Sequence, residues 1–241
     1  EALISTNELG AIMMEVSRNF GPEDNFLQKV RDLATKHGIV LMFDECTSGF
    51  RQTFGGLHKM YGVEPDMAMF GKALGNGYAI TAVLGKRSVM EAAQNTFISS
   101  TFWTERIGPT AALATLDVME QTKSWEIITK MGQYITEQWS SIAKSTGIAI
   151  KTSGLPALTS FSVDSKFALE YKTLITQEML KKSYLAGTSV YVATVHTKEI
   201  VDRFFAELEP VFALIRDCED GRDVKSLLDG PTCSSGFKRL N

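Results

Sequence analysis

The first half of this 241-residue sequence alternates short apolar runs with longer segments of helical periodicity, and this alternation constrains the fold most strongly. We expect four strands, at Ala11–Met14, Ile39–Phe43, Met67–Phe70 and Ala79–Leu84. The run Ile39–Phe43 is continuously apolar, which is typical of strands in a sheet covered on both faces. The pattern therefore predicts an α/β fold with a mostly parallel sheet.

One helix is expected between the first two strands. Pro22 is placed to open it, because proline is favoured in the first turn of a helix. Apolar residues then recur at spacings of three and four from Phe26 to Ala34, which indicates one buried helix face. The helix is expected to close at His37 and Gly38, where glycine can adopt the left-handed conformation.

The second half of the sequence predicts a smaller α+β domain. The pattern changes around Lys123 to Trp125, after a helix expected from about Ile107 to Gln121. Beyond this change we expect helices over Ile127–Trp139 and about Phe167–Leu185 and Lys198–Arg216, and strands near Ile148–Thr152, Leu158–Val163 and Ser189–Val195. Strand pairs followed by long helices favour a separate α+β domain. The chain therefore divides into residues 1–122 and 123–241, with a loop-like tail from Asp217.

Composition and charge narrow the class of protein. With 44% hydrophobic and 22% charged residues, the chain can bury a substantial core. The net charge of -3 gives no electrostatic reason to expect nucleic acid or an anionic membrane as a partner. No apolar run approaches the roughly 20 residues that span a bilayer. The first residues do not resemble a signal peptide.

Cysteine and histidine are scattered along the chain. Cys46, Cys218 and Cys233 lack CxxC spacing, which favours a reducing cytoplasm over a disulfide scaffold. The three histidines form no HExxH motif and no cluster with cysteine, so we expect no metal site and assign them ordinary surface or capping roles.

Two residues of opposite charge follow predicted strands. Asp44 comes directly after Ile39–Phe43, and Lys72 follows Met67–Phe70 with one glycine between. Functional groups in open α/β sheets gather at the carboxyl ends of strands, so we expect the two side chains to share a site. Glu45 is expected to support that site through local hydrogen bonds. The alternatives are a helix cap for Asp44 and a solvated lysine after a glycine turn for Lys72.

The segments around these residues resemble a known family. Phe43–Arg51 reads FDECTSGFR, Tyr61–Asp66 reads YGVEPD, and Phe70–Lys72 reads FGK. In this order and spacing they resemble class III pyridoxal-phosphate (PLP)-dependent aminotransferases, and within them the glutamate-1-semialdehyde aminomutase group. Thr101 and the late segment from Val190 to Thr197 extend the resemblance over nearly the whole chain. It implies the fold-type-I architecture, PLP as cofactor, and a homodimer with active sites at the interface.

The resemblance implies roles for five residues. Lys72 would bond covalently to the cofactor and carry protons, while Asp44 would keep the pyridine nitrogen protonated. Cys46 stands where the family usually has valine packed on the ring, and a small hydrophobe suits that place better than a reactive thiol. Ser100 and Thr101 match the position that reaches across the dimer to the neighbouring subunit's cofactor phosphate, with an ordinary loop cap as the alternative.

The sequence also departs from the family pattern. No turn that receives the cofactor phosphate and no ring-stacking aromatic is recognisable, so the sequence resembles the carboxy-terminal portion of a longer enzyme. The segment Gly75–Gly77 does not complete GxGxxG, since Ile80 occupies the third position, and it predicts a turn. Glu15 is followed by valine where many relatives have proline. Bulky Phe102 and Trp103 replace the stretch found in the aminomutases.

Three functions stay open on this basis. The favoured one is a PLP-dependent aminotransferase that moves an amino group between an amine or amino acid and a carbonyl acceptor. The second is an aminomutase that performs both halves on one carbon skeleton. The third is a non-catalytic aminotransferase-like protein, against which the intact pair of Asp44 and Lys72 argues.

Overall fold

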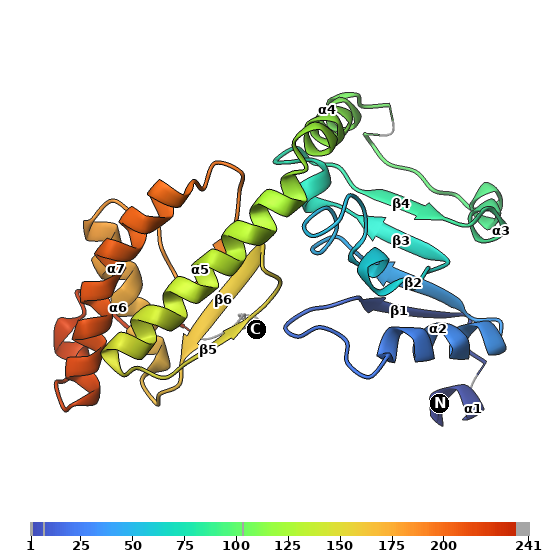
Figure 1. The fold of residues 1–241 in the computed structure, drawn as a ribbon. Coiled ribbons are helices and arrows are strands. Elements are labelled where there is room, and N and C mark those ends of the chain that lie inside the picture. Colours follow the sequence, from blue (N-terminus) through green and yellow to red (C-terminus); the bar gives the residue numbers. More distant parts are fainter. Residues whose placement is uncertain (1, 7, 103, 235–241) are drawn as a thin grey trace. The chain divides into compact units, whose positions relative to one another are not determined.

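The computed structural model describes residues 2–6, 8–102 and 104–234 (Figure 1). The chain divides into two compact units, Glu1–Ile127 and Ile128–Asn241. Helix α5 (Ser124–Thr146) carries the chain from the first unit to the second. Each unit has its own sheet and its own buried core.

The first unit is built on a four-stranded sheet with the strand order β1-β2-β3-β4. Its strands are β1 (Ala11–Glu15), β2 (Val40–Asp44), β3 (Met67–Phe70) and β4 (Ala82–Gly85). The first three run parallel, while β4 runs antiparallel to β3, so the predicted mostly parallel sheet is confirmed. The last strand begins at Ala82 and not at Ala79, because the ladder with β3 ends where Phe70 pairs with Ala82.

Helix α2 (Phe26–Lys36) connects β1 to β2 and lies beside the sheet (Figure 1). The prediction that Pro22 opens this helix is wrong. Asp24 and Asn25 both have positive φ angles, 51° and 55°, so the helical conformation cannot extend back through them. At the other end Gly38 has a φ of 65°, the left-handed conformation predicted for this glycine.

Asp66, which directly precedes β3, ties several segments of this unit together. Its carboxylate accepts hydrogen bonds from Arg31 of α2 and from Lys86 after β4, at 2.8 and 2.7 Å. It also accepts one from the backbone N–H of Leu41 in β2, at 2.8 Å. Burial by itself raises the pKa of this carboxyl, but Lys86, Leu41 and Arg31 together lower it to about 2. The ionised side chain therefore holds α2, β2 and β4 against the start of β3.

The two faces of the sheet are unequally covered. Leu41 and Phe43 of β2 are fully buried on one face. Val40 and Met42, which alternate with them and point to the other face, are only half-buried, and Met13 of β1 is exposed. The expectation of a sheet covered on both faces thus holds for one face only, because the described residues do not bury the side of Met13.

The other elements of the first unit are short, except for α4. They are α1 (Ala2–Thr6), η1 (Leu57–Tyr61), η2 (Lys72–Leu74), α3 (Arg87–Met90), η3 (Glu91–Asn95) and α4 (Ile107–Thr122). Helix α4 begins at the predicted residue and ends one residue past Gln121. The 3₁₀ turns were not predicted, since three to five residues leave no helical periodicity to recognise.

The second unit has a three-stranded antiparallel sheet with the order β5-β6-β7. Its strands are β5 (Ile150–Ser153), β6 (Leu158–Val163) and β7 (Ser189–Tyr191), and its helices besides α5 are α6 (Ala168–Lys181) and α7 (Lys198–Glu219). Trp139 of α5 packs on Phe161 of β6 with ring centroids 4.8 Å apart, and Phe212 of α7 lies 5.8 Å from Phe161. This α+β arrangement agrees with the prediction.

Two elements of the second unit end earlier than predicted. Helix α6 stops at Lys181 and not at Leu185, because Ser183 has a positive φ of 68°. Strand β7 stops at Tyr191 and not at Val195, because Tyr191 pairs with the first residue of β6 and the ladder ends there.

Helix α7 is longer than predicted. It continues past Arg216 to Glu219, and Arg216 donates a hydrogen bond to Asp220 one turn later, at 3.0 Å. The tail predicted as a loop from Asp217 also contains the short element η4 (Val224–Leu227). Residues 235–241 of that tail lie outside the described residues.

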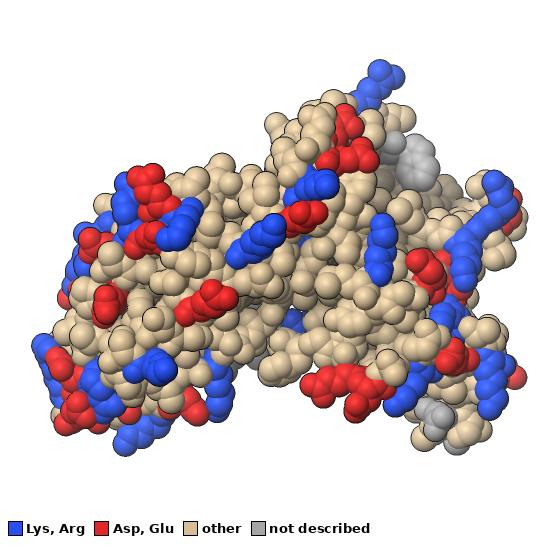
Figure 2. All heavy atoms as spheres, in the orientation of Figure 1, with Lys and Arg blue, Asp and Glu red and all other residues tan. Residues whose placement is uncertain are grey.

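Charged side chains of both signs are interspersed over the face shown in Figure 2, in keeping with a net charge of -3. No helix among the described residues is long and apolar enough to cross a membrane. Within the same part of the chain, no group of three or more His, Cys, Asp or Glu side chains is placed to hold a metal ion.

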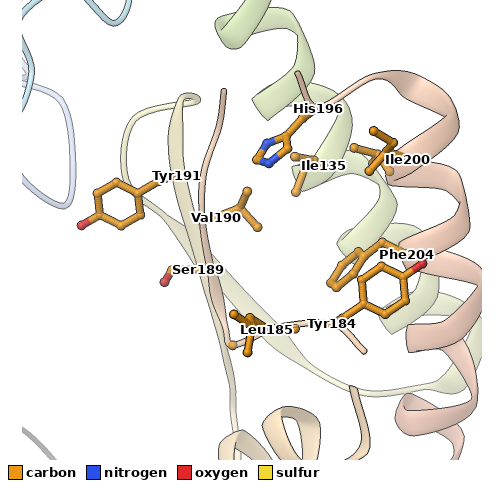
Figure 3. A pocket seen from close by; sticks show the side chains of 12 residues that line it. Ile135, Tyr184, Leu185, Ser189, Val190, Tyr191, His196, Ile200 and Phe204 are labelled. Carbon is orange, nitrogen blue, oxygen red and sulfur yellow. The ribbon is translucent and has the colours of Figure 1, made fainter. Parts of the chain in front are cut away.

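The second unit contains an apolar pocket of about 300 Å³ beside β7 (Figure 3). Ile135, Val190 and Phe204 line it, and His196 lies at its side. The ring nitrogen Nδ1 of His196 accepts a hydrogen bond from the backbone N–H of Ala193 at 3.2 Å. The predicted site residues do not line this pocket.

Candidate active site

Asp44 and Lys72 lie at the carboxyl ends of adjacent parallel strands, as the sequence predicts. Asp44 is the last residue of β2 and pairs with Met69 of β3. Lys72 begins η2, separated from the end of β3 by Gly71. Lys72 also has a φ of 44°, an uncommon conformation for a residue other than glycine. Uncommon backbone conformations concentrate at functional sites, and this one lies at the edge of the sheet where α/β proteins bind ligands.

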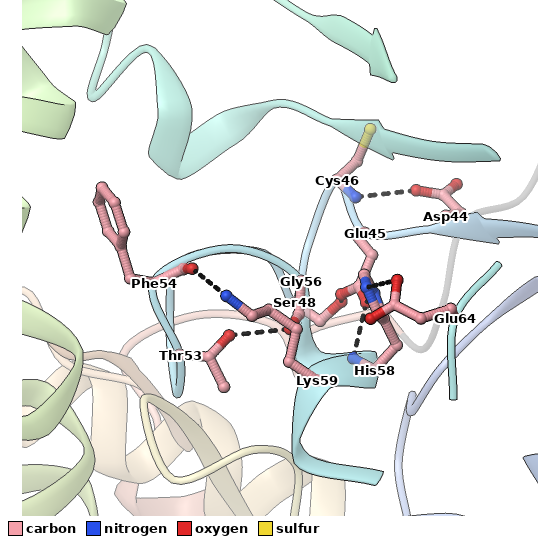
Figure 4. Close-up of polar contacts among 10 residues, drawn as sticks. All are labelled: Asp44, Glu45, Cys46, Ser48, Thr53, Phe54, Gly56, His58, Lys59 and Glu64. Atoms are coloured by element: carbon pink, nitrogen blue, oxygen red, sulfur yellow. Dashed lines mark hydrogen bonds and ion pairs between the residues drawn. The ribbon is translucent and has the colours of Figure 1, made fainter. Parts of the chain in front are cut away.

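Cys46 is hydrogen-bonded to Asp44 and packs against the backbone that leads into Lys72. Its backbone N–H donates to Oδ1 of Asp44 at 2.9 Å (Figure 4). Gly71 has no side chain, and a Cβ atom added to it would lie only 3.5 Å from Sγ of Cys46. The thiol therefore packs against the backbone that leads into Lys72. Burial raises the pKa of the Cys46 thiol and Asp44 raises it further, while the positive charge of Lys72 lowers it. The net shift is upward, so the thiol is protonated at neutral pH and resembles a small hydrophobe.

Thr47 contacts the candidate catalytic lysine directly. The Lys72 Nζ atom donates a hydrogen bond to Oγ1 of Thr47 at 2.6 Å. The carbonyl oxygen of Thr47 accepts another from Nε of Arg51 at 2.7 Å. The end of β2 therefore supplies a carboxylate to the edge of the sheet where Lys72 lies, and the loop after β2 supplies its hydroxyl partner.

Glu45, the first residue of this loop, is completely buried, and both oxygens of its carboxylate have hydrogen-bond partners (Figure 4). Oε1 of Glu45 accepts a hydrogen bond from the backbone N–H of His58 at 3.0 Å, and it also pairs with the ring nitrogen Nδ1 of the same histidine at 2.8 Å. The hydroxyl of Ser48 donates to the other carboxylate oxygen. Burial alone raises the pKa of Glu45, but the hydrogen bonds from His58 and Ser48 outweigh it and lower the pKa. An ionised Glu45 thus ties the loop after β2, through Ser48, to the element η1, through His58.

Ser100 and Thr101 lie in the exposed turn between η3 and α4. Oγ of Ser100 accepts a hydrogen bond from the backbone N–H of Phe102 at 3.3 Å, as a capping residue does. Within the described residues, neither Ser100 nor Thr101 bonds to Asp44 or Lys72. Hydrogen bonds and packing therefore join Asp44, Cys46, Thr47 and Lys72, and no described hydrogen bond joins Ser100 or Thr101 to Asp44 or Lys72. Trp103, which also departs from the aminomutase pattern, lies outside the described residues.

The sequence did not predict the roles of Thr47 and His58. A signal for His58 exists, because Glu45 follows a fully apolar strand and a buried carboxylate needs a partner. The signal for Thr47 is weaker. It is a hydroxyl three residues after Asp44, in a loop at the same edge of the sheet as Lys72, and only the folded geometry joins the two.

Comparison with known proteins identifies the family. The family model Aminotransferase class-III matches residues 3–207. A 3-aminobutyryl-CoA aminotransferase from Cloacimonas acidaminovorans is 34% identical over 187 residues, which cover 74% of this chain and 44% of that protein. A glutamate-1-semialdehyde 2,1-aminomutase from Natranaerobius thermophilus is 27% identical over 218 residues, covering 80% of this chain and 50% of that protein. The chain belongs to the class III aminotransferase family, and it spans about half the length of the curated relatives it matches.

Solved structures show the same fold. The FumI protein of Sphingopyxis sp. MTA144, in its PLP internal aldimine form, matches with a TM-score of 0.82 at 21% identity, over 94% of this chain and 57% of that one. An S-selective transaminase from Arthrobacter sp. matches with a TM-score of 0.74 at 18% identity, over 90% of this chain and 54% of that one. The expected fold-type-I architecture is thereby confirmed.

The residues at the carboxyl edge of the sheet fit a pyridoxal cofactor chemically. Such a cofactor needs an amine for its aldehyde and a carboxylate for its ring nitrogen, and Lys72 and Asp44 provide them from neighbouring strands. The half-buried side chain of Cys46 adds an apolar surface next to Gly71, the residue before Lys72.

Proposed function

We propose that the protein is a PLP-dependent aminotransferase, which moves an amino group between an amine or amino acid and a carbonyl acceptor. The observation that carries the proposal is the placement of Asp44 and Lys72 at the carboxyl ends of adjacent parallel strands in a class III chain. When bound, PLP supplies an aldehyde that reacts with amines and a ring that accepts electrons from the substrate carbon.

Each residue of the cluster has a distinct task in this proposal. Lys72 would hold the cofactor through Nζ, and the same amine would move a proton to and from the substrate carbon. Asp44 keeps the pyridine nitrogen protonated through its carboxylate. Cys46 packs on the ring as an apolar side chain, and the raised pKa of its thiol supports that role over a nucleophilic one.

An aminomutase is the second candidate. It is favoured by relatives such as the Natranaerobius protein, which carries that name and is 27% identical. The aminotransferase stays first because the Cloacimonas relative is 34% identical. Product analysis separates the two, since an aminomutase needs one carbon skeleton whereas an aminotransferase needs a separate carbonyl acceptor.

We also propose a homodimer in which Ser100 and Thr101 contact the cofactor phosphate of the neighbouring subunit. Both residues are exposed, and a hydroxyl and a backbone amide are suitable donors to a phosphate. The same turn exposes large apolar side chains, with Phe97 97% exposed and Phe102 75% exposed. Exposed apolar side chains grouped in this way mark surfaces that bind another protein.

The domain assignment follows the same proposal. Residues 1–122 would be the second half of a PLP-binding large domain, and residues 123–241 the small domain with its tail. The division of the chain into compact units near this point supports the assignment, as does the coverage of about half of each relative. A cytoplasmic location is proposed because Cys46, Cys218 and Cys233 are all free thiols.

A half-reaction tests the proposed activity. The complete protein is loaded with PLP and mixed with an amino donor, and the visible absorption band of the bound cofactor is followed. Loss of the band, with its return on adding a carbonyl acceptor, is the expected result. Lys72→Ala should abolish the cycle, whereas Lys29→Ala, which changes an exposed lysine on α2, should leave it intact. A wild-type protein that binds PLP but never exchanges amino groups would refute the proposal.

A further inference from the structure

The hydrogen bond between Lys72 and Thr47 has no part in the roles proposed so far. Nζ of Lys72 donates to Oγ1 of Thr47 at 2.6 Å. Among the described residues, Thr47 is the side chain that receives a hydrogen bond from this amine, and Lys72 forms no ion pair there. We propose that Thr47 is a positioning residue, which holds the Lys72 amine whenever it is not bonded to the cofactor. This inference rests on the proposed function.

The threonine hydroxyl is fixed in place by its own loop. Threonine branches at Cβ, so few side-chain rotamers are open to it. On one side of Thr47, Cys46 is bonded through its N–H to Asp44 at 2.9 Å. On the other side, the hydroxyl of Ser48 is bonded to the buried carboxylate of Glu45. Both neighbours are therefore anchored, and Oγ1 presents a fixed acceptor to the lysine.

A fixed acceptor matters because a free lysine side chain is flexible. It has a four-carbon stem, and its amine would otherwise sample many positions in solvent. A hydroxyl accepts an N–H from an amine and can also donate its own hydrogen, so it serves both protonation states. Held by Thr47, the Lys72 amine stays at the edge of the sheet that carries Asp44, ready to return to the cofactor. No covalent bond to Thr47 is made or broken.

The test measures how fast Lys72 captures PLP. The complete protein is stripped of cofactor and mixed rapidly with PLP, and the rise of the visible band gives a rate constant. Borohydride reduction and peptide mapping then show which lysine is labelled. Thr47→Val keeps the side-chain shape but removes the hydroxyl, and should slow capture by about 10-fold or more, as expected for one lost hydrogen bond to an amine. Thr47→Ser keeps the hydroxyl and should stay within a few fold of wild type.

A matched control comes from the same part of the chain. The hydroxyl of Thr53 donates to the carbonyl oxygen of Gly56 at 2.8 Å. Thr53→Val therefore removes one hydrogen bond from a threonine near the site without touching Lys72, and it should capture PLP at the wild-type rate. If Thr47→Val does not fold, as thermal unfolding would show, Thr47→Ala takes its place in the comparison with Thr47→Ser.

The outcomes separate this inference from the proposed function. If Thr47→Val captured PLP at the wild-type rate, with the pyridoxyl label on Lys72, the role of Thr47 would be overturned and the aminotransferase proposal would stand. Equal slowing in Thr47→Ser would overturn it too, because that variant retains the hydroxyl. In the wild-type protein, a pyridoxyl label on a lysine other than Lys72 would overturn both proposals.

Discussion

At the carboxyl end of β2, the carboxylate of Asp44 accepts a hydrogen bond from the backbone N–H of Cys46 and carries the charge that the proposed chemistry needs. Asp44→Ala removes that charge, and Asp44→Asn keeps a hydrogen bond without it. Both should slow proton removal from the donor carbon by at least about two orders of magnitude in single-turnover measurements. Asp32→Asn, on the exposed side of α2, is the control. Rates within a few fold of wild type would contradict the role of Asp44.

Glu45 gives a prediction about stability and pH. Its lowered pKa means that ionised Glu45 stabilises the folded protein at pH values above its unfolded value of about 4.5, and that this contribution is lost as the pH falls through the lower folded value. Glu45→Gln should reduce the free energy of unfolding by about 1 to 3 kcal/mol at pH 7, since a buried network loses its charged acceptor.

The measurement for Glu45 is urea denaturation of both proteins across pH 3.5 to 7. The difference in free energy of unfolding between wild type and Glu45→Gln should shrink below about pH 4.5. A difference that is constant with pH would show that the charge of Glu45 contributes nothing.

At the residue scale, spacing alone placed Asp44 and Lys72 in one cluster, because residues that follow adjacent parallel strands must meet at the same edge of a sheet. Cys46 was added to that cluster by the family resemblance. The partnerships of Glu45 with His58 and of Lys72 with Thr47 were not predictable in the same way. They depend on loop conformations, such as the positive φ of Lys72, that leave no periodic pattern in the sequence.

Among the secondary-structure elements, the sheet of the first unit depends on Asp66. The pKa of Asp66 lies at about 2, below its ordinary value of 3.8, so its ionised form stabilises the fold above pH 3.8 and loses that effect as the pH falls toward 2. Asp66→Asn should lower the free energy of unfolding at pH 7 by about 2 kcal/mol, because Arg31 and Lys86 lose their charged partner. Denaturation at pH 7 measures this, with the exposed Asp32→Asn as control. An unchanged midpoint would show that Asp66 does not hold the sheet together.

The strands Met67–Phe70 and Leu158–Val163 were predicted to the residue. The first is a short apolar run that follows Pro65 and Asp66, and the second ends with apolar Phe161 and Val163 at alternate positions. The errors fall at element ends. Pro22 is a plausible helix start, and only the left-handed conformations of Asp24 and Asn25 exclude it. Local sequence propensity cannot predict at which residue this helix begins, because the tertiary structure decides it.

For the whole molecule, the prediction concerns subunits. If Thr101 contacts the neighbouring subunit's phosphate, Thr101→Ala should weaken PLP retention by about 1 to 3 kcal/mol and leave the dimer intact. Mixing Lys72→Ala with Thr101→Ala protein should then restore activity, since one site of each heterodimer carries both defects and the other carries neither. Analytical ultracentrifugation verifies the exchange of subunits. No recovery despite exchange would place Thr101 in its own subunit's site or in a purely structural turn.

The central claim is that Lys72 is the residue that holds the cofactor. The complete protein is loaded with PLP, reduced with borohydride, digested and mapped by mass spectrometry. We expect the pyridoxyl group on Lys72, in the peptide that contains Phe70 and Gly71, and no labelling of Lys72 in cofactor-free protein treated the same way. A pyridoxyl group on Lys86 or any other lysine would contradict it.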